Sequence, residues 1–235
     1  MLLGEERLNL LASSSVAVVG LGGVGGMAAE MIARAGVGRI LLLDADVVSP
    51  SNRNRQIIAF ESTTGKAKAQ LVAARLKDIN PEAELQVAEV FLTEGNVESV
   101  ITPFAPDFVI DAIDTLAPKL ALISFCCKNG IPLVSSMGAG AKYDMTKVRI
   151  TDVSKTFNCP LAYVVRKKLR KMGISKGFKA VFSEELPDGG AIVEMDAAEQ
   201  AAVPHKKSQA GTISYLPAAF GCACAQAAIL HLISA

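Results

Sequence analysis

Residues 16–25 read VAVVGLGGVG, and this stretch decides the fold of the chain. A short apolar run is followed by Gly20, Gly22 and Gly25 in the spacing G-x-G-x-x-G, and small, helix-compatible residues fill positions 27–35. The pattern predicts a strand, a glycine turn and a helix. Glycines at such a turn let backbone N–H groups and a helix N-terminus approach phosphate oxygens.

An acidic residue supports a nucleotide site at this turn. Residues 40–43 form a second apolar run, which predicts a buried strand ending at Asp44. Asp44 follows Gly25 by about 20 residues, the spacing at which a carboxylate accepts a hydrogen bond from a ribose hydroxyl. We therefore favour a bound nucleotide over a purely structural glycine turn.

Strands and helices are expected to alternate along the next segments. The expected strands cover residues 85–90, 108–110 and 133–134, and the expected helices cover residues 66–79, the surroundings of residue 97, and residues 119–128. This alternation predicts an α/β fold, a Rossmann-like, doubly wound and mainly parallel sheet with helices on both faces.

The pattern changes near residue 140, where the doubly wound unit is expected to end. Residues 1–140 are predicted to form the Rossmann-like core, and residues 141–235 an antiparallel C-terminal extension of the same domain. The expected parts of the extension are a strand at 148–153, a basic amphipathic helix at 161–172, a strand at 180–183, a mobile connection within 173–211 and an apolar helix within 211–235.

The apolar C-terminal stretch resembles a buried helix more than a membrane span. Pro217, Gly221, Gln226 and His231 interrupt it, whereas a membrane span needs about 20 predominantly apolar residues. We expect this helix to be buried, with one face available for a subunit interface, and we expect no membrane partner.

Composition places the chain among ordinary globular proteins. Its 235 residues include 24 Lys and Arg against 23 Asp and Glu, which excludes partners bound by bulk charge. The five cysteines form no Cys-x-x-Cys pair and no secretory signal opens the chain, so we expect a reducing, cytoplasmic compartment. With only His205 and His231 besides, no structural zinc site is expected.

Cations gather where the strands of the predicted sheet end. Residues 51–56 read SNRNRQ and residues 65–68 read GKAK. Several cations at this edge suit a triphosphate, whose charge must be neutralised as pyrophosphate leaves, better than a dinucleotide. Arg53 and Lys66 are equally well interpreted as solvated loop charges. Asp114 could hold Mg²⁺, which prefers one or two carboxylates, whereas Asp111 is expected to be structural.

These residues together resemble a known superfamily. Its motifs are matched, in order and spacing, by Gly20, Gly22, Gly23 and Gly25, by Asp44, by Asn52, Arg55 and Gln56, by Gly65 and Lys68, and by Asp111 and Asp114. The stretch from residue 4 to residue 135 resembles the adenylating domain of the ubiquitin-activating-enzyme-like superfamily, which includes the adenylyltransferases of sulfur-carrier proteins.

The resemblance implies that the chain binds ATP with Mg²⁺ and transfers AMP to a carboxylate. The glycine turn would hold the nucleotide and Asp44 the ribose. The residues implied to contact the phosphates are Asn52, Arg55, Gln56 and Lys68. Arg55 and Lys68 would stabilise developing charge, and Asp114 would position Mg²⁺. An ionised carboxylate is already a nucleophile, so no general base is required.

Further segments resemble one branch of the superfamily, the tRNA threonylcarbamoyladenosine dehydratases. They are residues 111–114, 118–119, 131–134, 138–140, 151–156 and 181–184, together with the small-residue tail. This resemblance implies an ATP-dependent ligase or dehydratase, a homodimer, that adenylates the threonylcarbamoyl carboxylate on tRNA and promotes its cyclisation. Seven cations within residues 166–179 suit tRNA phosphates, although a solvated helix face is the alternative interpretation.

Other functions stay open from the sequence. The substrate could instead be the C-terminus of a ubiquitin-like or sulfur-carrier protein, with Cys159 forming a thioester, and a sulfur-transfer protein is a possible partner. A nucleotide-binding module without turnover and an NAD-dependent dehydrogenase are more distant alternatives. Superfamily members often receive an arginine from the partner subunit, but Arg7 matches no such motif and is left unassigned.

Overall fold

The computed structural model describes residues 2–194 and 208–234. The part of the expected mobile connection at 195–207, with His205, lies outside the described residues.

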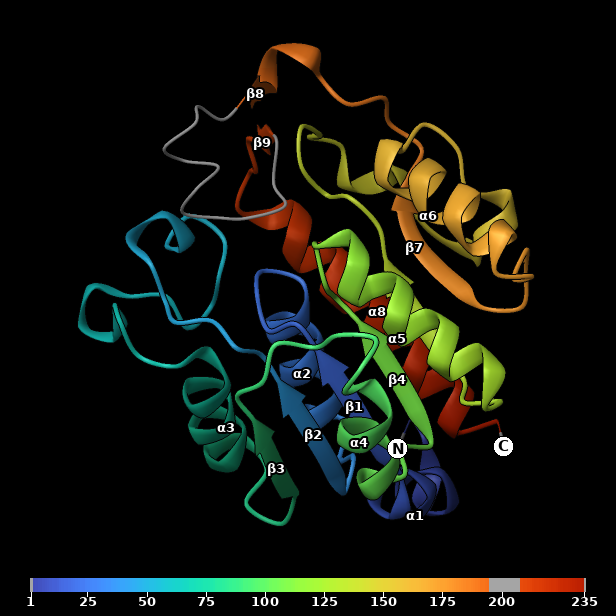
Figure 1. Ribbon diagram of the computed structural model, residues 1–235. Helices are drawn as coiled ribbons and strands as arrows, with labels where there is room; N and C mark the ends of the chain where they lie inside the picture. Colours follow the sequence, from blue (N-terminus) through green and yellow to red (C-terminus); the bar gives the residue numbers. More distant parts are fainter. Residues whose placement is uncertain (1, 195–207, 235) are drawn as a thin grey trace.

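A seven-stranded sheet runs through the centre of the protein (Figure 1). Its strands are β1 (Ser15–Val19), β2 (Arg39–Leu43), β3 (Glu84–Ala88), β4 (Phe108–Asp111), β5 (Leu133–Ser136), β6 (Val148–Asp152) and β7 (Lys179–Ser183). The spatial order is β3-β2-β1-β4-β5-β7-β6, with β6 antiparallel to β7 and every other pair parallel. The predicted α/β Rossmann-like fold is confirmed.

The helices cover both faces of this sheet. They are α1 (Gly4–Ser13), α2 (Gly25–Arg34), α3 (Lys68–Ile79), α4 (Val97–Ile101), α5 (Leu116–Lys128), α6 (Pro160–Lys171) and α8 (Tyr215–Leu232). Short 3₁₀ helices lie at Pro50–Asn52, Glu61–Thr63, Thr102–Phe104, Met145–Lys147, Val153–Lys155 and Gly189–Ala191, and β8 (Ile192–Glu194) pairs with β9 (Ser208–Ala210).

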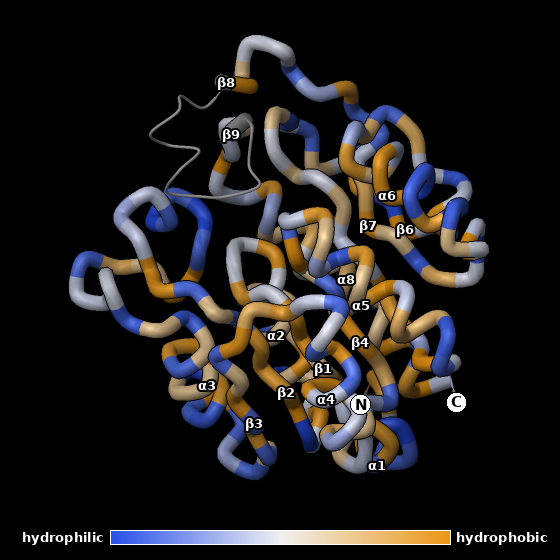
Figure 2. The backbone as a smooth tube through the Cα atoms, viewed as in Figure 1, coloured by the Kyte–Doolittle hydropathy of each residue, from blue (hydrophilic) through white to orange (hydrophobic). Residues whose placement is uncertain are grey.

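Alternate side chains of each strand enter two separate cores. In β1, Val16 and Val18 pack on the side of α2 and α8, whereas Ala17 and Val19 pack on the side of α5 and α6. Because successive strand residues point to opposite faces, a strand buried on both sides is apolar throughout. Figure 2 shows this hydropathy along β1, β2 and β4.

The apolar tail forms α8, which packs closely against α2. A Cβ built on Gly221 would lie 2.5 Å from the Val24 carbonyl oxygen and 2.8 Å from the Met27 Cβ. By length and composition alone α8 is suited to cross a membrane, yet half of it is buried inside the protein. This packing accounts for its apolar character and agrees with the interpretation as a buried helix.

The C-terminal extension continues the sheet further than the sequence suggested. We expected the doubly wound unit to end after β5, but β7 lies beside β5 and parallel to it. β6 pairs with β7 rather than with β5, and α6 joins β6 to β7. Residues 148–152 therefore form the antiparallel edge strand, and the segment after it supplies one more parallel strand.

Several predicted boundaries were wrong by a few residues; for example, the helix expected at 119–128 begins at Leu116. The helix expected from Lys66 begins at Lys68, because Ala67 is extended and forms an isolated bridge with Val47. The strand expected at 85–90 ends at Ala88.

A buried ion pair joins β4, β5 and α5. Asp111 and Lys119 are both 0% exposed, and the Lys119 Nζ lies 2.7 Å from the Asp111 Oδ2. The Ser135 hydroxyl donates to the same oxygen at 2.6 Å, and the Ile113 N–H donates to Oδ1 at 3.1 Å. Asp111 is thus structural, as expected, and it fixes the carboxyl end of β4.

Removing one partner of this pair should destabilise the protein strongly. Lys119→Met leaves the Asp111 carboxylate buried without a counter-charge, and we expect a loss of about 3–5 kcal/mol in the free energy of unfolding, measured by urea denaturation. The double variant Asp111→Asn, Lys119→Met removes both charges and should recover part of that loss. A single variant within about 1 kcal/mol of the wild type would contradict the assignment.

Candidate nucleotide site

The glycine turn joins β1 to α2 through contacts that exclude side chains. Gly20 has a φ of 87°, and a Cβ there would lie 2.9 Å from the Ala112 carbonyl oxygen. A Cβ on Gly25 would lie only 1.7 Å from the Gly20 carbonyl oxygen. The first turn of α2 therefore starts at the carboxyl end of β1, so the N-terminal end of the helix dipole lies at the turn.

Asp44 lies directly beside the glycine turn. Its Oδ2 accepts a hydrogen bond from the Leu21 N–H at 2.6 Å, and its Oδ1 accepts one from the Asp46 N–H at 2.8 Å. Burial raises the pKa of the Asp44 carboxyl, and the positive charge of Lys68 partly opposes this shift. The structure thus places Asp44, the residue predicted to bind the ribose, beside the predicted glycine turn.

Lys68 supplies a buried positive charge at the same edge. It is the first residue of α3, and its Nζ lies 2.8 Å from the Asp46 Oδ2. The carboxylate of Asp46 is largely exposed, whereas Lys68 is buried. The ammonium group is therefore held in place by a partner that faces solvent.

The loop after β2 places Arg55 and Gln56 against the glycine turn. A Cβ on Gly23 would lie 3.2 Å from the Arg55 carbonyl oxygen, and one on Gly22 would lie 3.6 Å from the Gln56 Nε2. Gln56 is 7% exposed, and its Oε1 has no hydrogen-bond partner within the described residues. A buried acceptor of this kind is uncommon and fits a hydrogen-bonding ligand at the turn.

Arg55 carries a charge that no acid neutralises in the described part of the chain. Its Nη1 donates to the Ser51 carbonyl oxygen at 2.9 Å and to the Asn54 Oδ1 at 2.8 Å, both neutral acceptors. Asn52 has a different part: it is buried, and its Oδ1 accepts the Ser49 N–H at 3.1 Å. Asn52 thereby shapes the loop. Within the described residues, the hydrogen bond found for its side chain is this one, and it does not reach the glycine turn.

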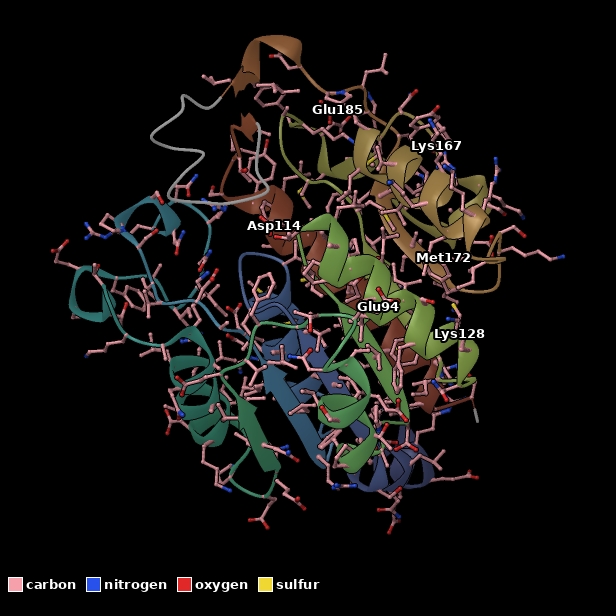
Figure 3. All side chains as sticks on the ribbon, viewed as in Figure 1. Glu94, Asp114, Lys128, Lys167, Met172 and Glu185 are labelled. Carbon is pink, nitrogen blue, oxygen red and sulfur yellow. The ribbon has the colours of Figure 1, made fainter. Side chains whose placement is uncertain are left out.

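Asp114 stands beyond the end of β4 on the exposed side of the site. The backbone of Ala112 and Ile113 lies against Gly20 of the glycine turn, and Asp114 is the next residue along the chain. Its Oδ1 accepts the Thr115 hydroxyl at 3.3 Å, and Figure 3 shows it at the start of α5. An exposed carboxylate fits Mg²⁺, which takes one or two protein carboxylates plus phosphate oxygens and water.

The remaining candidates have other contacts in the structure. Arg53 pairs with Glu61, which favours its interpretation as a loop charge, and Lys66 is exposed. Cys159 is buried and caps α6, where its Sγ accepts the Ala162 N–H at 3.5 Å. Among residues 2–194 and 208–234, no three His, Cys, Asp or Glu side chains are grouped to hold a metal ion.

Two polar residues near the site were missed by the sequence analysis. The Asn54 Nδ2 donates to the Thr212 carbonyl oxygen at 2.9 Å. Lys142 is 2% exposed and its Nζ donates to the Ser183 carbonyl oxygen at 3.2 Å; burial lowers the pKa of its ammonium group, against opposing shifts from Cys159 and Glu185. Only the position of Asn54 beside Arg55, and of Lys142 just after Gly140, offered a sequence signal.

Comparison with known proteins agrees with this geometry. The model of the ThiF family matches residues 1–235. The chain belongs to the ThiF family. One relative, the tRNA threonylcarbamoyladenosine dehydratase of Bacillus subtilis, is 51% identical over 185 residues, which cover 79% of this chain and 72% of the relative. The resemblance drawn from the motifs is thereby confirmed.

Solved structures of ThiF-like proteins extend the likeness over almost the whole chain. The E. coli tRNA N6-threonylcarbamoyladenosine dehydratase crystallised with ATP superposes with a TM-score of 0.87 at 38% identity, covering 99% of this chain and 91% of that one. Its complex with AMP gives a TM-score of 0.88. E. coli MccB, at 14% identity and a TM-score of 0.65, shares the fold.

The contacts of the glycine turn predict a contrast between two substitutions. Gly25→Ala forces a Cβ into the Gly20 carbonyl oxygen, and we expect it to lower the free energy of unfolding by about 3 kcal/mol or more. Gly22→Ala meets nothing closer than 3.6 Å and should fold with near-normal stability. Chemical denaturation of both variants checks this; equal stabilities would show that the turn is not constrained as described.

Proposed function

We propose that this ThiF-family protein is an ATP-dependent tRNA threonylcarbamoyladenosine dehydratase. The observation that carries the proposal is the likeness, over 99% of the chain, to an E. coli dehydratase crystallised with ATP and with AMP. The glycine turn, Asp44 and the adjoining cations form a site that suits the same nucleotide.

The nucleotide would lie with its phosphates at the N-terminus of α2. There the backbone N–H groups of the glycine turn and the helix dipole favour negative charge. Asp44 would accept a ribose hydroxyl, and the Gln56 Oε1, which has no partner within the described residues, would accept a further donor of the ligand. The turn carries no side chains at Gly20, Gly22, Gly23 and Gly25, so the phosphates would be able to approach its backbone.

Positive charge would stabilise the transfer of AMP. Arg55 and Lys68 lie at the same edge of the sheet and would bind phosphate oxygens as charge develops on pyrophosphate. Lys68 is already buried and oriented by Asp46, whereas Arg55 would exchange two neutral acceptors for phosphate. Asp114 would hold Mg²⁺, which supplies further neutralisation of the phosphates when bound.

The reaction would proceed in two balanced steps. An oxygen of the threonylcarbamoyl carboxylate attacks the α-phosphorus of ATP, which forms the acyl adenylate and releases pyrophosphate. The urea group of the same substituent then attacks the acyl carbon; the bond to AMP breaks, AMP leaves and the attacking group loses its proton. The net change in the nucleoside is the loss of one water. Positioning of the two groups within one substituent favours the closure.

Helix α6 and the strand that follows it would contact the tRNA. Lys167, Lys168, Arg170, Lys171, Lys176 and Lys179 are all exposed, and Arg166 donates to Thr156. No acidic residue lies within residues 166–179. Val165 and Leu169 turn inward, so the cations are left on the outer face to meet phosphates.

Further properties belong to the same proposal. The protein would act as a homodimer in the cytoplasm, where a reducing compartment keeps its five free cysteines as thiols. No structural zinc is expected.

A second candidate substrate is the C-terminus of a ubiquitin-like or sulfur-carrier protein. It is favoured by a relative, the E. coli molybdopterin-synthase adenylyltransferase, which is 32% identical over 156 residues and covers 66% of this chain. A sulfur-transfer or carrier protein is then the partner. Cys159 is the thiol that such chemistry would use.

Pyrophosphate exchange into ATP tests the proposal against this alternative. The protein is incubated with Mg²⁺ and radiolabelled pyrophosphate, and with threonylcarbamoylated tRNA, unmodified tRNA or a sulfur-carrier protein. We expect exchange only with the modified tRNA. Exchange with the carrier protein would replace the proposed substrate, and ATP binding without exchange would reduce the protein to a nucleotide-binding module.

The two proposed cations can be tested against a control residue from the same loop as Arg55. Arg55→Ala and Lys68→Ala should each cost about 2–4 kcal/mol of transition-state stabilisation, seen as a fall in kcat for adenylate formation. Arg53→Ala is the matched control, because Arg53 lies in the same loop but pairs with Glu61, and its kcat should stay within about twofold. Near-normal kcat in the Arg55 and Lys68 variants would remove both from the site.

The tRNA surface predicts a change in salt dependence. Lys167→Ala with Lys171→Ala should weaken tRNA binding and reduce the slope of log affinity against log salt by about one to two units. The control pair Lys77→Ala with Lys128→Ala removes as much charge from α3 and α5. Filter binding at several salt concentrations distinguishes them, and an equal loss in both pairs would argue against α6 as the contact surface.

A further inference from the structure

A second hollow adjoins the nucleotide site and is not explained by ATP. It has a volume of about 450 Å³ and is lined by Asn54, Ala141, Lys142, Tyr143, Ala191, Gly211, Thr212, Ile213 and Ser214. Another hollow, of about 310 Å³, lies elsewhere, between the segment after β3 and the helices α5 and α6. Ligand pockets commonly have volumes of about 300–1,000 Å³, so the larger hollow can hold a small substituent with part of a base.

Two walls of this hollow lead directly to the glycine turn. On one wall, Asn54 is followed by Arg55, whose carbonyl oxygen lies 3.2 Å from a Cβ built on Gly23. On another, Ser214 precedes α8, and the Pro217 Cβ lies 3.0 Å from that same Cβ position. The hollow therefore adjoins the part of the turn that would face the phosphates.

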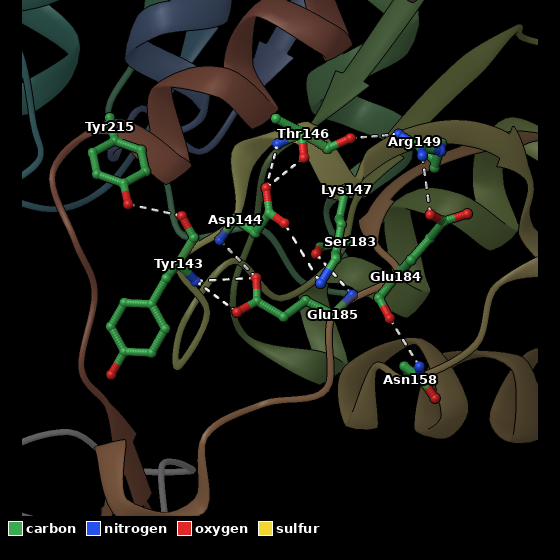
Figure 4. A network of polar contacts seen from close by, with 10 residues as sticks. All are labelled: Tyr143, Asp144, Thr146, Lys147, Arg149, Asn158, Ser183, Glu184, Glu185 and Tyr215. Carbon is green, nitrogen blue, oxygen red and sulfur yellow. Dashed lines mark hydrogen bonds and ion pairs between the residues drawn. The ribbon is translucent and has the colours of Figure 1, made fainter.

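The hollow is held in shape by hydrogen bonds between distant segments (Figure 4). The N–H groups of Tyr143 and Asp144 donate to the Glu185 carboxylate, at 3.1 Å and 2.8 Å. The Tyr215 hydroxyl donates to the Tyr143 carbonyl oxygen at 2.8 Å, and the Ala141 N–H donates to the Gly211 carbonyl oxygen at 2.8 Å. A preformed pocket needs little ordering when a ligand binds.

Asn54 links this hollow to the phosphate side of the site. Its Nδ2 donates to the Thr212 carbonyl oxygen at 2.9 Å, and its Oδ1 accepts from the Arg55 Nη1 at 2.8 Å. The side-chain amide of Asn54 thus holds both the Thr212 wall of the hollow and the guanidinium group of Arg55. A displacement of either would be transmitted to the other.

The chemistry of the lining suits an anion with amide-like groups. Lys142 is 2% exposed, and it forms no ion pair within residues 2–194 and 208–234. The nearby Glu185 carboxylate is already engaged by backbone N–H groups. The Lys142 Nζ donates to the neutral Ser183 carbonyl oxygen, and burial disfavours its charge, so a negatively charged ligand nearby would stabilise the ammonium group. Asn54, Thr212 and Ser214 add neutral groups that can bond a urea and a hydroxyl.

We propose that this hollow is the acceptor pocket, which holds the carboxylate-bearing urea substituent of the modified adenosine, and that Asn54 is a positioning residue that aligns Arg55 with it. The proposal rests on the proposed function and adds the location of the second substrate. It places the acceptor carboxylate and the α-phosphate on the two sides of the link between Asn54 and Arg55.

Filling the hollow tests the pocket without relying on turnover. Binding of the isolated threonylcarbamoyladenosine nucleoside is measured by calorimetry, with a non-hydrolysable ATP analogue present. Ala191→Phe should weaken nucleoside binding by about tenfold or more, while ATP affinity stays within about twofold. The control Ala74→Phe, on the exposed face of α3, should change neither affinity.

The positioning role of Asn54 has a separate readout that does not depend on the filled pocket. Asn54→Ala should lower kcat for adenylate formation by about tenfold with ATP affinity unchanged. Asn54→Gln keeps both an oxygen acceptor for Arg55 and an amide donor for the Thr212 carbonyl oxygen, and it should restore part of the kcat. Equal kcat values for the alanine and glutamine variants would overturn the positioning role.

The outcomes separate the pocket from the proposed function. Normal nucleoside binding in Ala191→Phe, no binding in the wild type, or a parallel loss of ATP affinity would each overturn the pocket. A different result would support the pocket and refute the dehydratase reaction. In that case the wild type binds the nucleoside and Ala191→Phe does not, but the wild type releases no pyrophosphate with modified tRNA.

Discussion

The close approach of α2 to the end of β1 is the constraint on which the rest of the site depends. A Cβ on Gly25 would lie 1.7 Å from the Gly20 carbonyl oxygen, and Gly20 itself leaves no room beside Ala112. Glycine at both positions lets a helix N-terminus stand at the carboxyl end of the central strand. Asp44 then bonds the turn through Leu21, and Gln56 packs beside Gly22. The nucleotide site follows from backbone packing before any charged group acts.

Two kinds of charge lie around this turn. Asp111 and Lys119 neutralise each other in the core, where an unpaired charge would be costly, and they hold the end of β4. Arg55, by contrast, bonds only neutral oxygens among the described residues. The ion pair between Asp111 and Lys119 keeps the core stable. The unneutralised charge of Arg55 at the edge of the sheet remains available to bind anions. Lys142, which lines the proposed acceptor pocket, likewise forms no ion pair within the described residues.

Much of this was predictable from sequence because the signals are local. The glycine spacing, the acid after the second strand and the apolar runs of β1 and β2 each lie within a short stretch, and the structure confirms the fold that they predict. The start of α3 and the parallel pairing of β7 depend on partners elsewhere in the chain. The bond from Asn54 to Thr212 spans 158 positions, and no local pattern encodes such a contact. The roles of the site residues stay predictions.

The central claim is that the protein activates a carboxylate by joining it to AMP. It is tested most directly by placing a heavy oxygen isotope in the threonylcarbamoyl carboxylate of the tRNA and analysing the nucleotide product by mass spectrometry. If the carboxylate attacks the α-phosphorus and AMP later leaves with the oxygen between them, the released AMP carries one labelled oxygen. With both carboxylate oxygens labelled, the second label stays in the cyclised nucleoside. Unlabelled AMP, or ADP as the nucleotide product, would contradict the account.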